Sequence, residues 1–124
     1  MNYQSLPEKR FIDRKRSQVS MDEIMDLEGT ADHLQLVGVA IIDEHGKMFH
    51  LDAPARHGDL MPYIYNNHIT DWDEAKAWIA QASQGFITKD GRFVDRMTGG
   101  VLACTTKQIS KLAHPPQLYS EDLW

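Results

Sequence analysis

The first regular pattern of polar and apolar positions begins at residue 20. Ser20 stands three residues before Glu23, which is the spacing of a capping box at a helix start. Residues 24–27 are mostly apolar, and Gly29 offers a point at which a helix can end. The pattern therefore predicts a short helix at about 21–28.

The next segment has the pattern of two strands joined by a turn. Residues 34–43 are apolar on both alternating faces and rich in β-branched side chains, which predicts a strand covered on both sides. A polar turn follows at 44–47, and the strand pattern returns at 48–52. Pro54 closes this segment. Together these features indicate a β-hairpin.

Two helices are expected between this hairpin and residue 85. Apolar residues fall at helical spacing along 60–68, and Asp59 supplies negative charge near the expected helix start. A second helix is expected to start at Asp71, whose spacing from Glu74 is again typical of a cap. Gly85 is expected to end it.

A second hairpin and a third long helix complete the pattern. Asp90-Gly91 lies between two strand-like runs in 86–95, which is the strongest short hairpin signal in the chain. Residues 97–109 are expected to be helical up to the break before Pro115-Pro116. The tail 118–124 mixes apolar and acidic residues and is expected to pack on the domain.

The order of these elements predicts the fold class. Two hairpins with clustered helices favour an α+β fold, in which a small antiparallel sheet packs with three to four helices. The edges of so small a sheet need cover from helices or from another subunit. We therefore expect a homo-oligomer, at least a dimer.

Composition narrows the range of functions. The chain has 124 residues, enough for one domain, and its net charge of −5 argues against binding of duplex DNA. It has one cysteine, which excludes an internal disulfide and a thiol zinc cluster. No window approaches the ~18 apolar residues of a membrane span, and the first residues are polar rather than signal-like. A cytoplasmic location is expected.

Charge is divided unevenly along the chain. Residues 1–20 hold five basic and two acidic groups, a net charge of +3, so the remainder holds 8 basic and 16 acidic groups, or −8. We expect residues 1–19 to form a basic, flexible arm and residues 20–124 to form a single ligand-binding domain. An alternative is that the arm docks on the acidic body of a neighbouring subunit.

Motifs for catalysis are weak. The chain has no glycine-rich phosphate loop, no metalloprotease pattern and no nucleophile elbow, so no catalytic residue, metal site or cofactor is expected. His68-Ile69-Thr70 matches the His-x-Thr/Ser motif of two-histidine cyclic phosphodiesterases. Such an enzyme needs two of these motifs, because one imidazole accepts a proton while the other donates one.

Two clusters carry groups suited to a small nucleotide. One spans 56–59, and the other follows the second hairpin turn at 92–96. Arginine forks suit phosphate, a phenylalanine face suits a base, and an aspartate can accept from an amino or hydroxyl group. Phe86 or Phe93 is the expected stacking platform and Asp95 the acceptor. The alternative interpretation is that the arginines are solvated and the phenylalanines are core. The candidate ligand-binding residues are Arg56, His57, Asp59, Phe86, Arg92, Phe93, Asp95 and Arg96.

These residues lie within a pattern that resembles a known family. Residues 85–96 (GFITKDGRFVDR), Gln108-Ile109 and 118–124 (LYSEDLW) resemble the first type of phage Thoeris anti-defence protein. Residues 56–60 and 37–42 look like the family's upstream helix start and its first strand. One departure lies at 97–100 (MTGG), where the family pattern has good helix formers after its arginine.

The resemblance implies a function. Proteins of that family are sponges, which sequester cyclic ADP-ribose isomers made by a bacterial immune enzyme and do not cleave them. Some members assemble as dimers or hexamers, and some also hold cyclic trinucleotides at a separate site, so the resemblance implies a dimer or a hexamer here. The resemblance thus implies a non-enzymatic phage protein that binds a small cyclic nucleotide signal in the host cytoplasm. Two alternatives remain: a cyclic-nucleotide-degrading phosphodiesterase, and a protein-binding inhibitor of a host defence factor.

Overall fold

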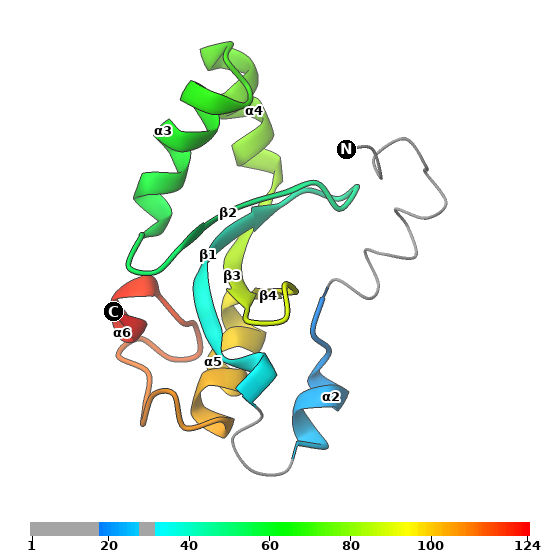
Figure 1. Cartoon of the computed structure of the whole chain (residues 1–124), viewed down its shortest axis with the longest axis vertical. Helices are drawn as coiled ribbons and strands as arrows, with labels where there is room; N and C mark the ends of the chain where they lie inside the picture. The colour runs from blue at the N-terminus through cyan, green and yellow to red at the C-terminus, as the bar shows by residue number, and fades with distance from the viewer. Residues whose placement is uncertain (1–17, 28–31) are drawn as a thin grey trace.

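A computed structural model of the chain describes residues 18–27 and 32–124 (Figure 1). Within these ranges, one four-stranded antiparallel sheet in the order β2-β1-β3-β4 packs with five α-helices, so the α+β fold is confirmed. Most of the predicted basic arm, residues 1–17, lies outside the described residues, as does Gly29. The elements are α2 (Met21–Met25), a short 3-10 helix η2 (Asp32–Leu34), β1 (Leu36–Ile42), β2 (Met48–Asp52), α3 (His57–Asn67), α4 (Trp72–Gln81), β3 (Ser83–Thr88), β4 (Phe93–Asp95), α5 (Arg96–Thr105) and α6 (Ser120–Leu123).

The predicted elements are present, most with shorter ranges. Ser20 caps α2 by accepting a hydrogen bond from the main-chain N–H of Glu23 at 3.1 Å, as its spacing indicated. The two hairpins form as expected, and Asp71 caps α4 by accepting from Glu74. In the predicted tail, Ser120–Leu123 forms one more helical turn, α6.

The core lies mainly on one face of the sheet. The larger cluster joins the strands to α3 and α5 through buried residues such as Phe86, Val94, Leu60 and Leu102. A smaller cluster on the other face consists of Ala40, Ile42, Ile87 and Phe93. The central strand β1 is therefore buried on both faces, as its continuous apolar run predicted. Helices α3 and α4 pack side by side and extend beyond one end of the sheet (Figure 1).

One predicted boundary is wrong. Helix α4 ends at Gln81, and Gly85 lies inside β3 rather than at the helix end. A Cβ atom at Gly85 would stand 2.1 Å from the main-chain oxygen of Val94 and 2.7 Å from the ring of Phe93. Glycine is required here because β4 and the Phe93 ring approach the β3 main chain so closely.

Helix α5 also ends earlier than predicted, at Thr105. Lys107 then takes a left-handed main-chain conformation with φ of 64°, and Gln108 turns back toward the sheet. The Gln108 side chain exchanges two hydrogen bonds with the main chain of Leu36, at 2.8 and 2.9 Å. This glutamine therefore fastens the segment after α5 to the start of β1.

None of the described helices is both long enough and apolar enough to cross a membrane.

Candidate functional site

The candidate site begins in the segment that connects β2 to α3. Arg56 caps this helix, and its main-chain N–H donates to the carboxylate of Asp59 at 2.9 Å. The Arg56 guanidinium donates to the main-chain oxygen of Trp124. In return, the Trp124 indole N–H donates to the main-chain oxygen of Ala55 at 2.8 Å. These bonds hold α6 against the start of α3, where Figure 1 also places it.

His57, the first residue of α3, points toward the sheet. Its Nε2–H donates to the main-chain oxygen of Gly85 at 2.6 Å, and its ring meets Phe86 edge-on at 5.1 Å. Because a carbonyl oxygen can only accept, the neutral ring carries its proton on Nε2 and leaves a lone pair on Nδ1. Burial lowers the pKa of His57, the Gly85 bond opposes this, and the charge of Arg96 lowers it further. The imidazole is therefore neutral at pH 7.

Arg96, the first residue of α5, is a second cationic residue near His57, besides Arg56. Its guanidinium lies over the ring of Tyr119, with 4.9 Å between the carbon Cζ and the ring centre. Its main-chain oxygen accepts from Leu118 at 3.0 Å, which brings the segment before α6 against α5. The Arg96 Nε is buried and has no hydrogen-bond partner among the described residues. An arginine with a free buried donor is suited to an anion.

The starts of three helices thus meet in one region. The α3 and α5 starts contribute Arg56, His57 and Arg96, and the α6 segment contributes Tyr119 and Glu121, whose charge also acts on His57. Each of these starts is already capped by a carboxylate of the chain: Asp59 at α3, Asp95 at α5 and Asp122 at α6. We call Arg56, His57, Arg96, Tyr119 and Trp124 the helix-start cluster.

Three of the residues expected at the site have structural surroundings instead. Phe86 and Phe93 are 0% and 2% exposed, so neither presents a face on which a base could stack. They belong to the core, as the alternative interpretation held. Asp95 is exposed, and its side chain caps α5 by accepting from the N–H of Thr98 at 2.7 Å. A carboxylate that caps a helix start is a structural partner of that helix.

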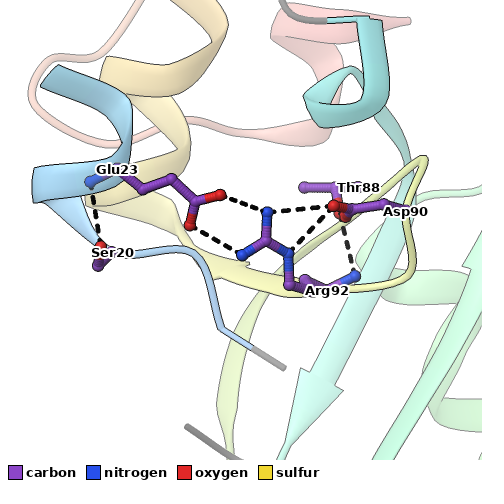
Figure 2. A network of polar contacts seen from close by, with 5 residues as sticks. All are labelled: Ser20, Glu23, Thr88, Asp90 and Arg92. Atoms are coloured by element: carbon purple, nitrogen blue, oxygen red, sulfur yellow. Dashed lines mark hydrogen bonds and ion pairs between the residues drawn. The ribbon is translucent and has the colours of Figure 1, made fainter. Parts of the chain in front are cut away.

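Arg92 also lies apart from the helix-start cluster. It stands four residues before Arg96, about 13 Å at the rise of a strand. Two of its nitrogens donate to the two carboxylate oxygens of Glu23, at 2.8 and 2.6 Å, and a third donates to Asp90 at 3.2 Å (Figure 2). Its guanidinium therefore joins α2 to the hairpin turn. Of the eight candidate residues, the structure brings together Arg56, His57, Asp59 and Arg96.

Glu23, Asp90 and Arg92 form a second cluster, in which both carboxylates pair with the Arg92 guanidinium. The hydrogen bonds from Arg92 lower the pKa of Glu23 against the opposing effect of burial. Burial alone would raise the pKa of Asp90, but hydrogen bonds from Thr88 and Arg92 outweigh it and hold that pKa below its usual value. The Glu23 bonds in turn raise the pKa of Arg92. All three groups stay charged at neutral pH.

Tyr119 and Trp124 were not among the candidate residues predicted from the sequence. The mixed apolar and acidic pattern of the tail predicted that it packs on the domain, but not which residues it contacts. Nowhere in the described ranges do three or more His, Cys, Asp or Glu side chains gather so that they could hold a metal ion.

The fold and this cluster define a small α+β protein with cationic side chains gathered at helix starts. Residues 35–124 match the family model described as phage T4 y16D protein. The match runs from the residue before β1 through α6, and the chain belongs to this family of phage proteins. No curated protein and no solved structure matches the chain.

Proposed function

We propose that this phage protein is an anti-defence sponge, which binds a cyclic ADP-ribose-type immune signal and holds it without cleaving it. The observation that carries the proposal is the pairing of Arg96, with its buried and unpartnered Nε, with the neighbouring His57 and Arg56. The pyrophosphate of such a ligand carries two negative charges. Two arginine guanidinium groups are a suitable partner for those charges.

Each group of the helix-start cluster has a role in this proposal. Arg96 and Arg56 donate to the pyrophosphate oxygens, and the His57 ring lies beside them, where Nδ1 can take up a proton and become a further donor. The half-buried rings of Tyr119 and Trp124 supply the aromatic surface beside the base. The resemblance of the 85–96 and 118–124 segments to the Thoeris anti-defence proteins supports the identity of the ligand.

Sequestration fits the cluster better than cleavage does. General acid–base cleavage of a phosphodiester is served by two proton-transfer groups, one accepting while the other donates. His57 is the one imidazole of the cluster, and its Nε2–H is already bonded to Gly85. The other basic members are arginines, which do not give up a proton at neutral pH.

The test follows the fate of the ligand. Purified protein is titrated calorimetrically with cyclic ADP-ribose, its linkage isomers and cyclic trinucleotides, and each mixture is then heat-denatured and analysed by chromatography. A sponge binds at fixed stoichiometry and returns the ligand intact. Product peaks would favour the phosphodiesterase alternative. A ligand that stays free throughout would favour a protein-binding inhibitor.

A charge-matched pair of variants ties binding to the cluster. Arg96→Ala should weaken binding, whereas Lys89→Ala should not, because Lys89 lies at the far hairpin turn in an exposed pair with Asp32. With this function we also propose that the protein acts in the cytoplasm of the infected host, where the signal is made. We propose further that it acts as a homo-oligomer.

A further inference from the structure

The helical hairpin of α3 and α4 carries apolar side chains that the core does not use. Met61 and Trp72 are 36% and 46% exposed, and Tyr65 is half-buried. The rings of Tyr65 and Trp72 meet edge-on with 5.0 Å between their centres, and Met61 lies one turn before Tyr65 on the same side of α3. None of the three belongs to either core cluster of the described residues. We call Met61, Tyr65 and Trp72 the hairpin strip.

The position of the hairpin makes this strip accessible to a large partner. Helices α3 and α4 extend beyond one end of the sheet (Figure 1). Because α3 runs from His57 to Asn67, its last turn lies about 15 Å from the helix-start cluster. Further along α4, Trp78 and Ile79 pack against the core, so they hold the helix in place without help from Trp72.

The surroundings of the strip are acidic. Three exposed carboxylates lie beside Trp72 at the start of α4: Asp71, Asp73 and Glu74. Residues 60–81 hold these three acidic groups and one basic group, Lys76, whose ammonium lies 5.8 Å from the centre of the Trp72 ring. No ion pair within the described part of the chain involves any of the three carboxylates. Their charge is therefore available to a basic partner.

Charge decides between the possible partners of an exposed tryptophan. Such a ring can stack on a nucleic-acid base, lie at a membrane interface or fill a pocket on another protein. The carboxylates beside Trp72 repel nucleic-acid phosphates and anionic lipids. A second copy of this chain is also a poor match, because residues 21–124 hold 8 basic and 16 acidic groups.

We propose that the hairpin strip docks into an apolar pocket with a rim of lysine or arginine on a different protein. Trp72 fills the pocket, Tyr65 and Met61 lengthen the apolar contact, and Asp73 and Glu74 face the basic rim. Buried aromatic anchors with complementary charge around them are typical of protein interfaces. The docking is independent of the ligand proposed for the helix-start cluster.

The first test uses random peptides displayed on filamentous phage. They are selected on immobilised wild-type protein and depleted on Trp72→Ala, which removes peptides that bind elsewhere. The enriched peptides should combine apolar residues with lysine or arginine. In calorimetry, a synthetic copy should bind Trp72→Ala at least about tenfold more weakly than the wild type. No enrichment after depletion, or enriched peptides without basic residues, would overturn the proposal.

Matched variants separate the strip from general effects. Val101→Ala truncates a side chain that is 37% exposed on α5, and it should keep the wild-type affinity for the peptide. Asp73→Lys should weaken peptide binding, whereas Asp52→Lys, which makes the same charge change at an exposed position of β2, should not. Circular dichroism should give both lysine variants the wild-type spectrum. Equal weakening by Asp73→Lys and Asp52→Lys would contradict docking at the hairpin.

Three further measurements address the other occupants of the strip. By light scattering, Trp72→Ala should have the same mass as the wild type. The wild type should show no Trp72-dependent co-sedimentation with phosphatidylglycerol vesicles and no Trp72-dependent gel shift with single-stranded oligo-dT. A smaller mass for Trp72→Ala would assign the strip to a second copy. Binding to the vesicles or to oligo-dT that is lost in Trp72→Ala would assign it to a membrane or a nucleic acid, and any of these results would overturn the proposal.

Discussion

Glu23 and Arg92 lie 69 residues apart in the sequence and are joined by two parallel hydrogen bonds between guanidinium and carboxylate. Glu23 belongs to α2, which precedes the part of the chain matched by the phage family, and Arg92 stands within that part. The pair is largely shielded, with the Arg92 side chain 21% exposed and the Glu23 side chain 34% exposed. It therefore fastens α2 to the family domain, and it gives Arg92 a structural role.

Arg92→Ala should destabilise the fold. The change leaves the half-buried Glu23 carboxylate without its two donors, and hydrogen bonds to charged groups contribute about 1.5–3 kcal/mol. We expect a loss of about 1–3 kcal/mol in the free energy of unfolding, measured by urea denaturation. Lys89→Ala breaks an exposed pair with Asp32 and should cost less than about 1 kcal/mol. Equal effects of the two variants would mean that the Glu23 pair does not stabilise the fold.

Local patterns predicted most of the elements because their causes are local. The Ser20 cap depends on a residue three positions away, and the Asp90-Gly91 turn depends on its own two residues. The partner of Arg92 depends on how α2 packs, which no local pattern contains. A guanidinium suited to a ligand phosphate is equally suited to a carboxylate, so residue type alone did not separate these roles.

The place of Phe93 follows from a non-local cause as well. Alternation along β4 puts Phe93 and Asp95 on one face, and that spacing suggested a platform with an acceptor beside it. The same face of the sheet also carries Ala40 and Ile42 of β1, whose apolar surface must be covered. β3 lies between β1 and β4, and the Phe93 ring on β4 packs in the smaller cluster. Phe93 therefore supplies part of that cover.

Phe93→Ala should lower the melting temperature markedly. The ring is 2% exposed, and truncation of a buried phenylalanine typically costs about 3–5 kcal/mol. Met97→Ala is the control, since Met97 is 54% exposed and its truncation should change stability by less than about 0.5 kcal/mol. Differential scanning fluorimetry compares the two. A Phe93→Ala protein that melts near the wild type would remove the ring from the core and restore it as a candidate platform.

Two glycine variants should act in opposite directions. Gly85→Ala places a methyl group against the main chain of β4, so it should destabilise the fold by more than about 2 kcal/mol, within the range for overpacking. Gly58→Ala lies in α3 with open space around it, so it should stabilise the fold by about 0.4–1 kcal/mol. Chemical denaturation measures both. A tolerated Gly85→Ala would show that β3 and β4 can separate at this point.

Arg56→Ala and Arg96→Ala should each weaken binding of the cyclic ADP-ribose-type ligand. Loss of a hydrogen bond to a charged group costs about 1.5–3 kcal/mol, which corresponds to roughly ten- to a hundredfold in affinity. Calorimetry on folded variants provides the measurement. Arg92→Ala, which lies apart from the cluster, should retain the wild-type affinity wherever it remains folded. Unchanged affinity in both the Arg56 and Arg96 variants would remove the helix-start cluster from the site.

The titration of His57 should couple stability and binding to pH with opposite signs. Burial lowers the pKa of His57 in the folded protein, whereas an unfolded histidine titrates near about 6.5. The unfolded chain therefore binds a proton first as the pH falls. The stability that His57 contributes is complete above that value and is lost as the pH falls through the pKa of the folded state.

An anionic ligand beside the imidazole reverses this preference, because a nearby negative charge favours the protonated ring. The affinity of the wild type should thus increase from pH 7.5 to pH 5.5 while the stability of the free protein decreases. His57→Gln keeps an N–H that can donate to Gly85 and does not titrate, so both pH dependences should become flatter. Calorimetry and thermal melts across this pH range test the pair of signs. An affinity that does not depend on pH in the wild type would place the ligand's charge away from His57.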